Sequence, residues 1–328
     1  MIPASSDRFR VRPWSSEREV GPPDRDNQRF DLLISACGFE ARSAHVHTTH
    51  AEWFDDTVAV TFPDRHELSY HANRAHFEDA GVSLLDLQDR DYSPWLQGLI
   101  FEQLAARGRA LRIMIDISSL SRSRMAAAVE TVTTLDPTFA VECVFAYSPS
   151  TFTPPPPPAD MAICQPVSPY FAGFSAFPGE PPTLIVGVGY EPDRALGIAE
   201  YLEPGLTVIF RPVGIEPAFD SIVANSNALL YTRPGVRSRF VDYPLADPFA
   251  LFASLESVVS SLQARRPTLV PMGPKPFALA ALLAAALHLP DASVWRVSPG
   301  EAEQALEREA LGPIVGISVD VPPRSGGA

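Results

Sequence analysis

The chain has 328 residues, of which 46% are hydrophobic, 20% charged and 9% aromatic. This length is enough for about two domains, each with its own core, and the composition excludes a disordered or fibrous chain. The formal net charge of −13 disfavours binding of DNA or RNA through bulk charge, because a polyphosphate needs a positive surface. Any anionic ligand must therefore be met by a few local cations.

The cysteines and the hydropathy of the sequence indicate the cellular compartment in which the protein is expected. Cys37, Cys143 and Cys164 are far apart and form no CxxC pair, so neither a disulfide framework nor a zinc site is indicated. The longest apolar run, Phe277–Leu287, is shorter than the roughly 20 residues that a membrane-spanning helix needs. The first thirty residues are polar where a secretion signal would be apolar. We therefore expect a cytoplasmic protein with no membrane partner.

The first half of the chain alternates strands and helices after a polar beginning. Residues 1–29 are rich in proline, serine and charge, and we interpret them as a loosely held N-terminal arm. The elements expected after it are strand Asp31–Cys37, helix Ala41–Trp53, strand Thr57–Phe62, helix Glu67–Ala80, strand Val82–Leu87, helix Pro94–Arg107, strand Leu111–Ile117, helix Ser121–Leu135 and strand Phe139–Tyr147. This alternation predicts a Rossmann-like domain over residues 30–147, with a mostly parallel sheet.

The same alternation restarts after a proline-rich segment. Residues 148–182 include five consecutive prolines, 154–158, and are interpreted as a linker that is partly polyproline II. The elements expected next are strand Thr183–Val188, helix Asp193–Leu202, strand Leu206–Phe210, helix Pro217–Leu230, strand Ser238–Asp242, helix Pro248–Arg265, strand Thr268–Pro271, helix Pro276–Leu289 and strand Ser293–Val297. We expect a second Rossmann-like domain over 183–300 and a C-terminal extension over 301–328.

Two short sequence features of the first half recur in the second half, and the distance along the sequence is nearly the same for both. Gly38-Phe39-Glu40 follows the first strand and matches Gly189-Tyr190-Glu191, 151 positions later. Arg122 follows the fourth strand and matches Lys275, 153 positions later. The shared spacing and the shared element order favour a repeat over chance similarity. The predicted fold class is α/β, with two tandem Rossmann-like parallel-sheet domains related by internal duplication.

The loop after the fourth strand of the first half is the leading candidate site. It reads Asp116-Ile117-Ser118-Ser119-Leu120-Ser121-Arg122 and opens a helix. Hydroxyls, main-chain N–H groups and an arginine at a helix start suit a phosphate oxygen. The alternative is a plain N-cap, in which one of the three serines satisfies the first N–H groups and Asp116 pairs with Arg122.

The turns after the first strands are the second candidate. In Gly38-Phe39-Glu40-Ala41-Arg42 and in Gly189-Tyr190-Glu191 with Arg194, glycine permits a tight turn, the aromatic ring could stack on a base and arginine could meet a phosphate. The alternative is an aromatic core anchor beside a local Glu–Arg ion pair. Neither turn is a GxGxxG motif.

These motifs carry a family resemblance. Asp116, Ser118 and Arg122 fit the [DN]-x-[ST]-x-x-x-[RK] pattern found after the fourth strand of CRISPR-associated Rossmann fold (CARF) domains, which bind cyclic oligoadenylates. Residues 272–277 of the second half, with Gly273 and Lys275, look like the Gly-Gly-Thr-Lys-x-Met version of that loop. Two such units in one chain are similar to SAVED domains, which sense cyclic nucleotides in anti-phage signalling. The second half departs from the pattern, because Val270 and Met272 replace its polar residues.

Other chemistry-bearing residues favour structural interpretations. His45, His47 and His50 do not share one helix face, so a surface group is favoured over a metal site. Cys37 could be a nucleophile, but a buried small hydrophobe is more usual. We expect no catalytic residue, no metal and no cofactor.

Three functions remain open from the sequence. The first is a sensor that binds a nucleotide-like ligand, a cyclic oligonucleotide being suspected, between its two CARF-like halves and acts through a separate effector protein. The second is a metal-independent ring nuclease that uses the same site to cleave a phosphodiester. The third is a non-catalytic scaffold subunit of a defence complex.

Overall fold

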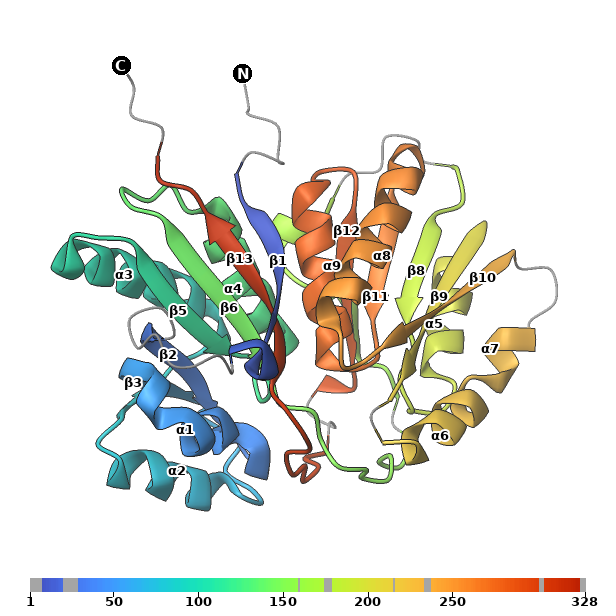
Figure 1. Cartoon of the computed structure of the whole chain (residues 1–328). Helices are drawn as coiled ribbons and strands as arrows, with labels where there is room; N and C mark the ends of the chain where they lie inside the picture. The colour runs from blue at the N-terminus through green and yellow to red at the C-terminus, as the bar shows by residue number, and fades with distance from the viewer. Residues whose placement is uncertain are drawn as a thin grey trace. The chain divides into compact units, whose positions relative to one another are not determined.

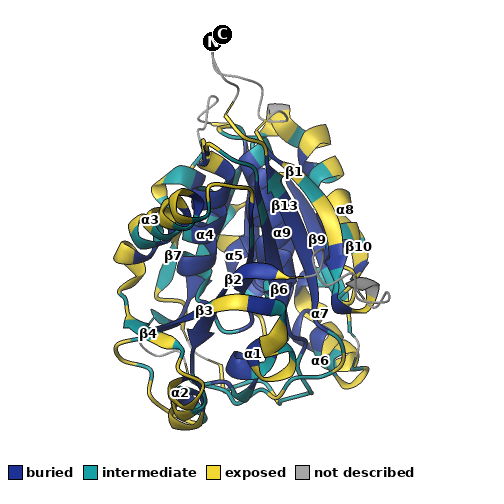
Figure 2. Cartoon of the chain, turned by 60° about the vertical axis from the view of Figure 1, so that its left-hand side comes forward, coloured by how far each residue is buried: buried dark blue, intermediate teal, exposed yellow. Residues whose placement is uncertain are grey.

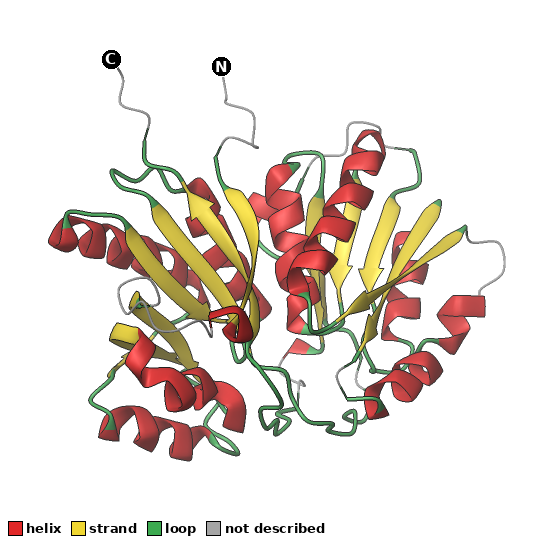
Figure 3. Ribbon diagram, viewed as in Figure 1, coloured by secondary structure: helices red, strands yellow, loops and turns green. Residues whose placement is uncertain are grey.

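A computed structural model describes residues 8–19, 29–158, 160–173, 179–214, 216–232, 237–300 and 304–324. The chain divides into two compact units, which we describe separately (Figure 1). Unit 1 consists of Met1–Thr151 and Ala305–Ala328, and unit 2 consists of Phe152–Gln304. Each unit holds one mostly parallel sheet with helices beside it, which confirms the α/β class (Figure 3).

Unit 1 is built on a seven-stranded sheet with the order β1-β13-β6-β5-β2-β3-β4. The five strands from β6 to β4 are parallel, whereas β13 is antiparallel to both of its neighbours. The strands are β1 (Arg10–Ser15), β2 (Phe30–Cys37), β3 (Phe54–Thr61), β4 (Ser83–Asp86), β5 (Leu111–Asp116), β6 (Val141–Tyr147) and β13 (Val315–Val321). The central strand β2 is buried at every position, as expected of a strand covered on both faces.

The helices of unit 1 connect the parallel strands. They are α1 (His45–His50), α2 (Tyr70–Asp79), α3 (Asp89–Arg107) and α4 (Arg122–Thr134). Right-handed crossovers put α1 and α2 on one face of the sheet, and α3 and α4, which pack together, on the other. The single helix expected over Ala41–Trp53 is instead α1 flanked by two 3₁₀ turns, Ala41–Ala44 and Ala51–Trp53.

Unit 2 has a six-stranded sheet with the order β10-β9-β8-β11-β12-β7. Its strands are β7 (Ile163–Pro166), β8 (Thr183–Gly187), β9 (Leu206–Val213), β10 (Ser238–Pro244), β11 (Pro267–Pro271) and β12 (Ser293–Ser298). Its helices are α5 (Arg194–Leu202), α6 (Ala218–Ser226), α7 (Ala228–Thr232), α8 (Pro248–Leu262) and α9 (Lys275–Leu287). The helix expected over Pro217–Leu230 is divided into α6 and α7 at Asn227.

Both units use one strand order. Numbered from β2 in unit 1 and from β8 in unit 2, the parallel strands lie in the order 3-2-1-4-5, with an antiparallel sixth strand beside the fifth. This common topology supports internal duplication.

Three strands lie in segments that were expected to be outside the two domains. The N-terminal arm contains β1, the linker contains β7, and the C-terminal extension contains β13. The strand β7 follows the last parallel strand of unit 1 yet pairs with β12 of unit 2, and β13 follows the last strand of unit 2 yet pairs with β6 of unit 1. Each sheet is therefore extended by the strand that, in the sequence, follows the last parallel strand of the other sheet. This added strand pairs with the fifth parallel strand, whose edge would otherwise be unpaired.

Burial is greatest in the central strands and in α9, which are dark blue in Figure 2. Every residue of α9 from Pro276 to Ala286 is buried, so this helix has no polar face. Within the described part of the chain, no helix combines the length and hydropathy needed to cross a membrane.

The position of β13 inside the sheet predicts the effect of trimming it. Ile317 is fully buried and pairs in register with Phe145 of β6. We expect Ile317→Ala to lower the free energy of unfolding of unit 1 by about 2–5 kcal/mol, the usual loss for such a core truncation. Urea unfolding followed by tryptophan fluorescence measures it, with the exposed Leu229→Ala as the control. An unchanged transition would contradict β13 as an internal strand.

Candidate functional site

The two candidate loops of each unit leave neighbouring strands. In unit 1 the turn 38–42 follows β2 and the loop 116–122 follows β5, and β2 pairs with β5. In unit 2 the corresponding strands β8 and β11 are also paired. The strand order reverses between these two strands, which is where open α/β sheets bind ligands at their carboxyl ends.

In unit 1 the turn and the loop touch. A Cβ added at Gly38 would lie 3.2 Å from the Cβ of Ser119 and 3.3 Å from the Oγ of Ser43. The Gly38 N–H donates to Ser43 Oγ at 2.8 Å. A side chain at position 38 would therefore be tight, and Ser119 or Ser43 would have to move by a few tenths of an ångström to admit it.

Hydroxyls and a carboxylate order the loop 116–122. Asp116 Oδ1 accepts from the Ser118 N–H at 2.8 Å, and Ser118 Oγ accepts from the Ser148 N–H at 2.8 Å. Ser121 is the N-cap of α4, because its Oγ accepts from the Arg124 N–H at 3.1 Å. The capping alternative is thus realised by Ser121. Among the described residues, the buried hydroxyls of Ser119 and Ser148 have no hydrogen-bond partner.

Helix α4 begins at Arg122, the cation that the sequence analysis proposed for binding an anion. Arg122 is the first helical residue and is half-buried. Two positions later, Arg124 is fully buried and donates to Asp89 at 2.9 Å and to the Thr61 carbonyl at 3.0 Å, with its guanidinium 3.9 Å from the Phe62 ring centroid. Arg124 therefore fixes the start of α4 against the carboxyl end of β3. Sequence reasoning missed it, although an arginine in an alanine-rich helix is a signal.

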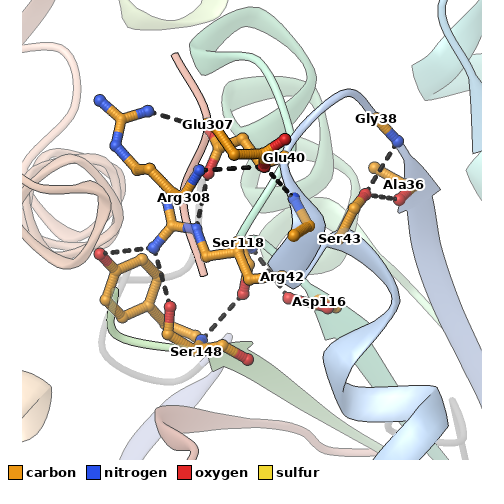
Figure 4. A network of polar contacts seen from close by, with 12 residues as sticks. Ala36, Gly38, Glu40, Arg42, Ser43, Asp116, Ser118, Ser148, Glu307 and Arg308 are labelled. Atoms are coloured by element: carbon orange, nitrogen blue, oxygen red, sulfur yellow. Dashed lines mark hydrogen bonds and ion pairs between the residues drawn. The ribbon is translucent and has the colours of Figure 1, made fainter. Parts of the chain in front are cut away.

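The turn after β2 contains a buried ion pair (Figure 4). Arg42 Nε donates to Glu40 at 2.6 Å, and its NH1 donates to the Tyr147 hydroxyl at 3.1 Å and to the Ser148 carbonyl at 2.8 Å. Burial alone would lower the pKa of the Arg42 guanidinium, but Tyr147 and Glu40 raise it above its ordinary value. The Arg42 side chain is 3% exposed, so the structure gives it the role of an internal ion-pair partner.

The C-terminal segment completes this network. Arg308 NH1 donates to Glu40 at 3.1 Å, and the Arg42 N–H donates to the Arg308 carbonyl at 3.1 Å. Glu307 accepts from the Ala41 N–H at 2.6 Å. These residues lie more than 260 positions from the turn, and no local pattern in the sequence connects the two.

Two asparagines hold the glycine turns and were also missed. Asn73 Nδ2 donates to the carbonyls of Gly38 and Glu40, both at 2.9 Å. Asn227 Nδ2 donates to the Gly189 carbonyl at 2.8 Å. The two asparagines are 154 positions apart, so the spacing of the repeat, followed further along the chain, could have found them.

The unit 2 loops repeat the close approach. A Cβ added at Gly189 would lie 2.6 Å from the Met272 carbonyl oxygen, and one added at Gly273 would lie 2.5 Å from that of Val188. Lys275 is the first residue of α9, as Arg122 is of α4. The aromatic residues Phe39 and Tyr190 are both half-buried and pack against core clusters, which matches the core-anchor alternative.

A pocket of about 190 Å³ lies beside the second turn. It is lined by Pro156, Pro157, Pro158, Asp160, Met161, Glu191, Pro192, Asp193 and Arg194. Glu191 and Arg194 pair at 3.5 Å, so the carboxylates in the lining outnumber its cation. This balance suits a phosphate less well than the helix starts at Arg122 and Lys275 do.

The histidines pair within unit 1. His47 Nδ1 lies 2.9 Å from His76 Nε2, and burial together with His76 lowers the pKa of His47, which favours its neutral form. No group of three His, Cys, Asp or Glu side chains suited to a metal occurs in the ranges that the structure describes.

The buried ion pair predicts a stability effect. Arg42→Ala leaves Glu40 buried with one of its two guanidinium partners removed, and we expect the free energy of unfolding to fall by about 3–5 kcal/mol. Arg74→Ala, which removes an exposed ion pair with Glu78, is the control and should change little. Urea denaturation compares the two variants. Equal effects would show that Arg42 does not stabilise the turn.

The cysteine chemistry is also testable. Burial raises the pKa of Cys37 to about 11, so at pH 8 only about one thiol in a thousand is ionised. We expect iodoacetamide to label Cys37 in the native protein far more slowly than in denaturant, as measured by peptide mass spectrometry. Fast native labelling would support the nucleophile hypothesis instead.

Comparison with known proteins adds little. No family model and no curated protein matches the chain. Among solved structures, the cytoplasmic domain of a prokaryotic cation chloride cotransporter is 11% identical, with a TM-score of 0.23, over 83% of this chain and 97% of that one. A putative universal stress protein from Pseudomonas aeruginosa UCBPP-PA14 is 9% identical, with a TM-score of 0.25, over 86% and 94%. A protein of unknown function from Pseudomonas aeruginosa PAO1 is 9% identical, with a TM-score of 0.25, over 82% and 92%. TM-scores of this size do not establish a common fold.

Proposed function

We propose that the chain is a sensor that binds a phosphorylated, nucleotide-like ligand at the carboxyl ends of its parallel strands and acts through a separate partner protein. One observation carries the proposal. In both units the helix after the fourth strand begins with a cation, Arg122 in α4 and Lys275 in α9, next to a glycine turn packed against that loop.

Each of the two helix starts concentrates positive charge. The N-terminus of a helix carries about half a positive charge, and Arg122 and Lys275 each add a full positive charge in the first turn. Main-chain N–H groups together with a side-chain cation are the donors that a phosphate takes at a helix start. In unit 1 the hydroxyls of Ser119 and Ser148 would gain an acceptor, which matters because an unsatisfied buried donor costs about 1–3 kcal/mol.

The resemblance to CARF and SAVED domains supports a cyclic oligonucleotide as the ligand and anti-phage signalling as the setting. Asp116, Ser118 and Arg122 carry this resemblance in unit 1, whereas unit 2 has Val270 and Met272 at the polar positions. The principal phosphate contact of the proposal is therefore Arg122, with Lys275 in a weaker second site.

The burial and hydrogen bonding of Asp116 favour a sensor over a nuclease. This carboxylate is 1% exposed and holds the Ser118 N–H, so it orders the loop and is poorly placed to take a proton from a ribose hydroxyl. Binding without turnover needs only differential affinity for two conformations of the protein.

Titration calorimetry with cyclic and linear oligoadenylates tests the proposal. We expect Arg122→Ala to weaken binding by about 1.5–3 kcal/mol, or roughly 10- to 150-fold, and Lys275→Ala by less. Arg90→Ala, an exposed arginine on α3, is the matched control and should bind like the wild type. The ligand should be recovered intact by chromatography after long incubation.

Two outcomes would contradict the sensor. Absence of binding by the wild type at millimolar ligand would favour the scaffold function. Multiple turnovers that disappear in Arg122→Ala would favour the ring nuclease.

A further inference from the structure

Residues 305–311 of unit 1 lie against the first glycine turn, and we call this segment the strap. It precedes β13, and its residues up to 309 form neither helix nor strand. Two backbone hydrogen bonds, of 3.0 and 2.8 Å, join strap residues 309 and 311 to the segment 149–151. The other attachment is at residues 307 and 308, which contact the turn. The position of the strap over the turn therefore depends on these two residues.

The Glu307 carboxylate accepts hydrogen bonds from two separate segments of unit 1. Its Oε1 accepts from the Ala41 N–H at 2.6 Å, and its Oε2 accepts from the Ser69 hydroxyl, just before α2, at 2.7 Å. A main-chain N–H and a hydroxyl are also donors that a phosphate oxygen takes. A carboxylate of the chain itself thus holds donors that suit an oxyanion ligand.

This carboxylate lies at the proposed ligand site of unit 1. The turn that it contacts follows β2, and a Cβ added at Gly38 of that turn would lie 3.2 Å from the Cβ of Ser119, in the loop that leads to Arg122. Figure 4 shows Glu307 on the same side of the network as Arg308 and Glu40. A ligand that reaches the turn from this site therefore meets Glu307.

The strap can leave the turn without leaving Glu40 unpaired. Arg308 NH1 donates to Glu40 at 3.1 Å, and the Arg308 carbonyl accepts from the Arg42 N–H at 3.1 Å. Glu40 also pairs with the Arg42 side chain at 2.6 Å, and this ion pair does not involve the strap. Release of Glu307 and Arg308 removes one negative and one positive charge, so the net charge at the turn is conserved.

We propose that the strap is autoinhibitory: the Glu307 carboxylate occupies the place of a ligand phosphate at the first turn, and a phosphorylated ligand displaces it. The docked strap lowers the affinity for the ligand, because only the released state is competent to bind. The released strap is a change of conformation that a partner protein can recognise. This use of the strap rests on the proposed function.

Inorganic phosphate, added to the full chain, tests the displacement. The reporter is the Arg42 amide, which donates to the Arg308 carbonyl while the strap is docked. We expect phosphate to raise its hydrogen exchange, measured by NMR, at least about fivefold over chloride at the same ionic strength, the lower end of usual coupling. In Glu307→Ala this amide should exchange fast already, with no further effect of phosphate. Equal exchange in phosphate and chloride would overturn the proposal.

Glu309→Ala is the matched control. It removes the same charge from an exposed side chain of the strap and keeps the backbone bond to Thr151, so it should respond to phosphate like the wild type. Faster exchange in β2 would reveal that Glu307→Ala has lost the fold. Glu307→Gln then takes its place, since it keeps an oxygen acceptor without the charge, and less phosphate should release its strap than in the wild type.

Calorimetry with the oligoadenylates that test the sensor gives a second measurement. Because the internal competitor is removed, Glu307→Ala should bind at least about fivefold more tightly than the wild type and Glu309→Ala. Equal or weaker binding would show that Glu307 only stabilises the turn, and would overturn the autoinhibition. If neither the wild type nor Glu307→Ala binds, the sensor is contradicted, while the phosphate experiment still decides whether the strap is displaced by an anion.

Discussion

The turn of the first candidate site depends on the buried ion pairs of the Glu40 carboxylate with Arg42 and Arg308. A charge removed from water costs several kcal/mol unless it is paired and hydrogen-bonded. Glu40 is 4% exposed and is met by the guanidinium groups of Arg42 and Arg308. Arg42 also donates hydrogen bonds to Tyr147 and Ser148 at the end of β6, and Arg308 belongs to the C-terminal segment. The ion pairs of Glu40 therefore connect the turn to two parts of unit 1 that are distant in the sequence.

Much of the fold follows from local pattern. Hydrophobic periodicity and helix- or strand-breaking residues predicted the ten parallel strands and most of the helices between them, because each element buries its own apolar face and ends at its own turn residues. The segments 41–53 and 217–230 were the exceptions, since each is divided into shorter helices. The sixth strands β7 and β13 could not be found in this way. Their short apolar runs lie among prolines and polar residues, and they pair with strands that are 129 or more positions away in the sequence.

The candidate site likewise contains residues that local sequence pattern predicts and residues that depend on distant contacts. The loop at Arg122 and the turn at Gly38 could be predicted, since a topological rule places both at one end of the sheet. The burial of Arg42 could not, because it depends on Arg308, which only the completed sheet brings near. The contact of Glu307 with the turn likewise has no sequence signature.

The exchange of sixth strands has a consequence for how the chain is made. During synthesis, β6 emerges long before residues 315–321, which supply its neighbour β13 and, through β13, the attachment of β1. The first sheet therefore waits with an open edge while the whole of unit 2 leaves the ribosome. Unpaired edges of this kind invite wrong pairing between nascent chains, so the length of unit 2 sets the time during which unit 1 is vulnerable to aggregation.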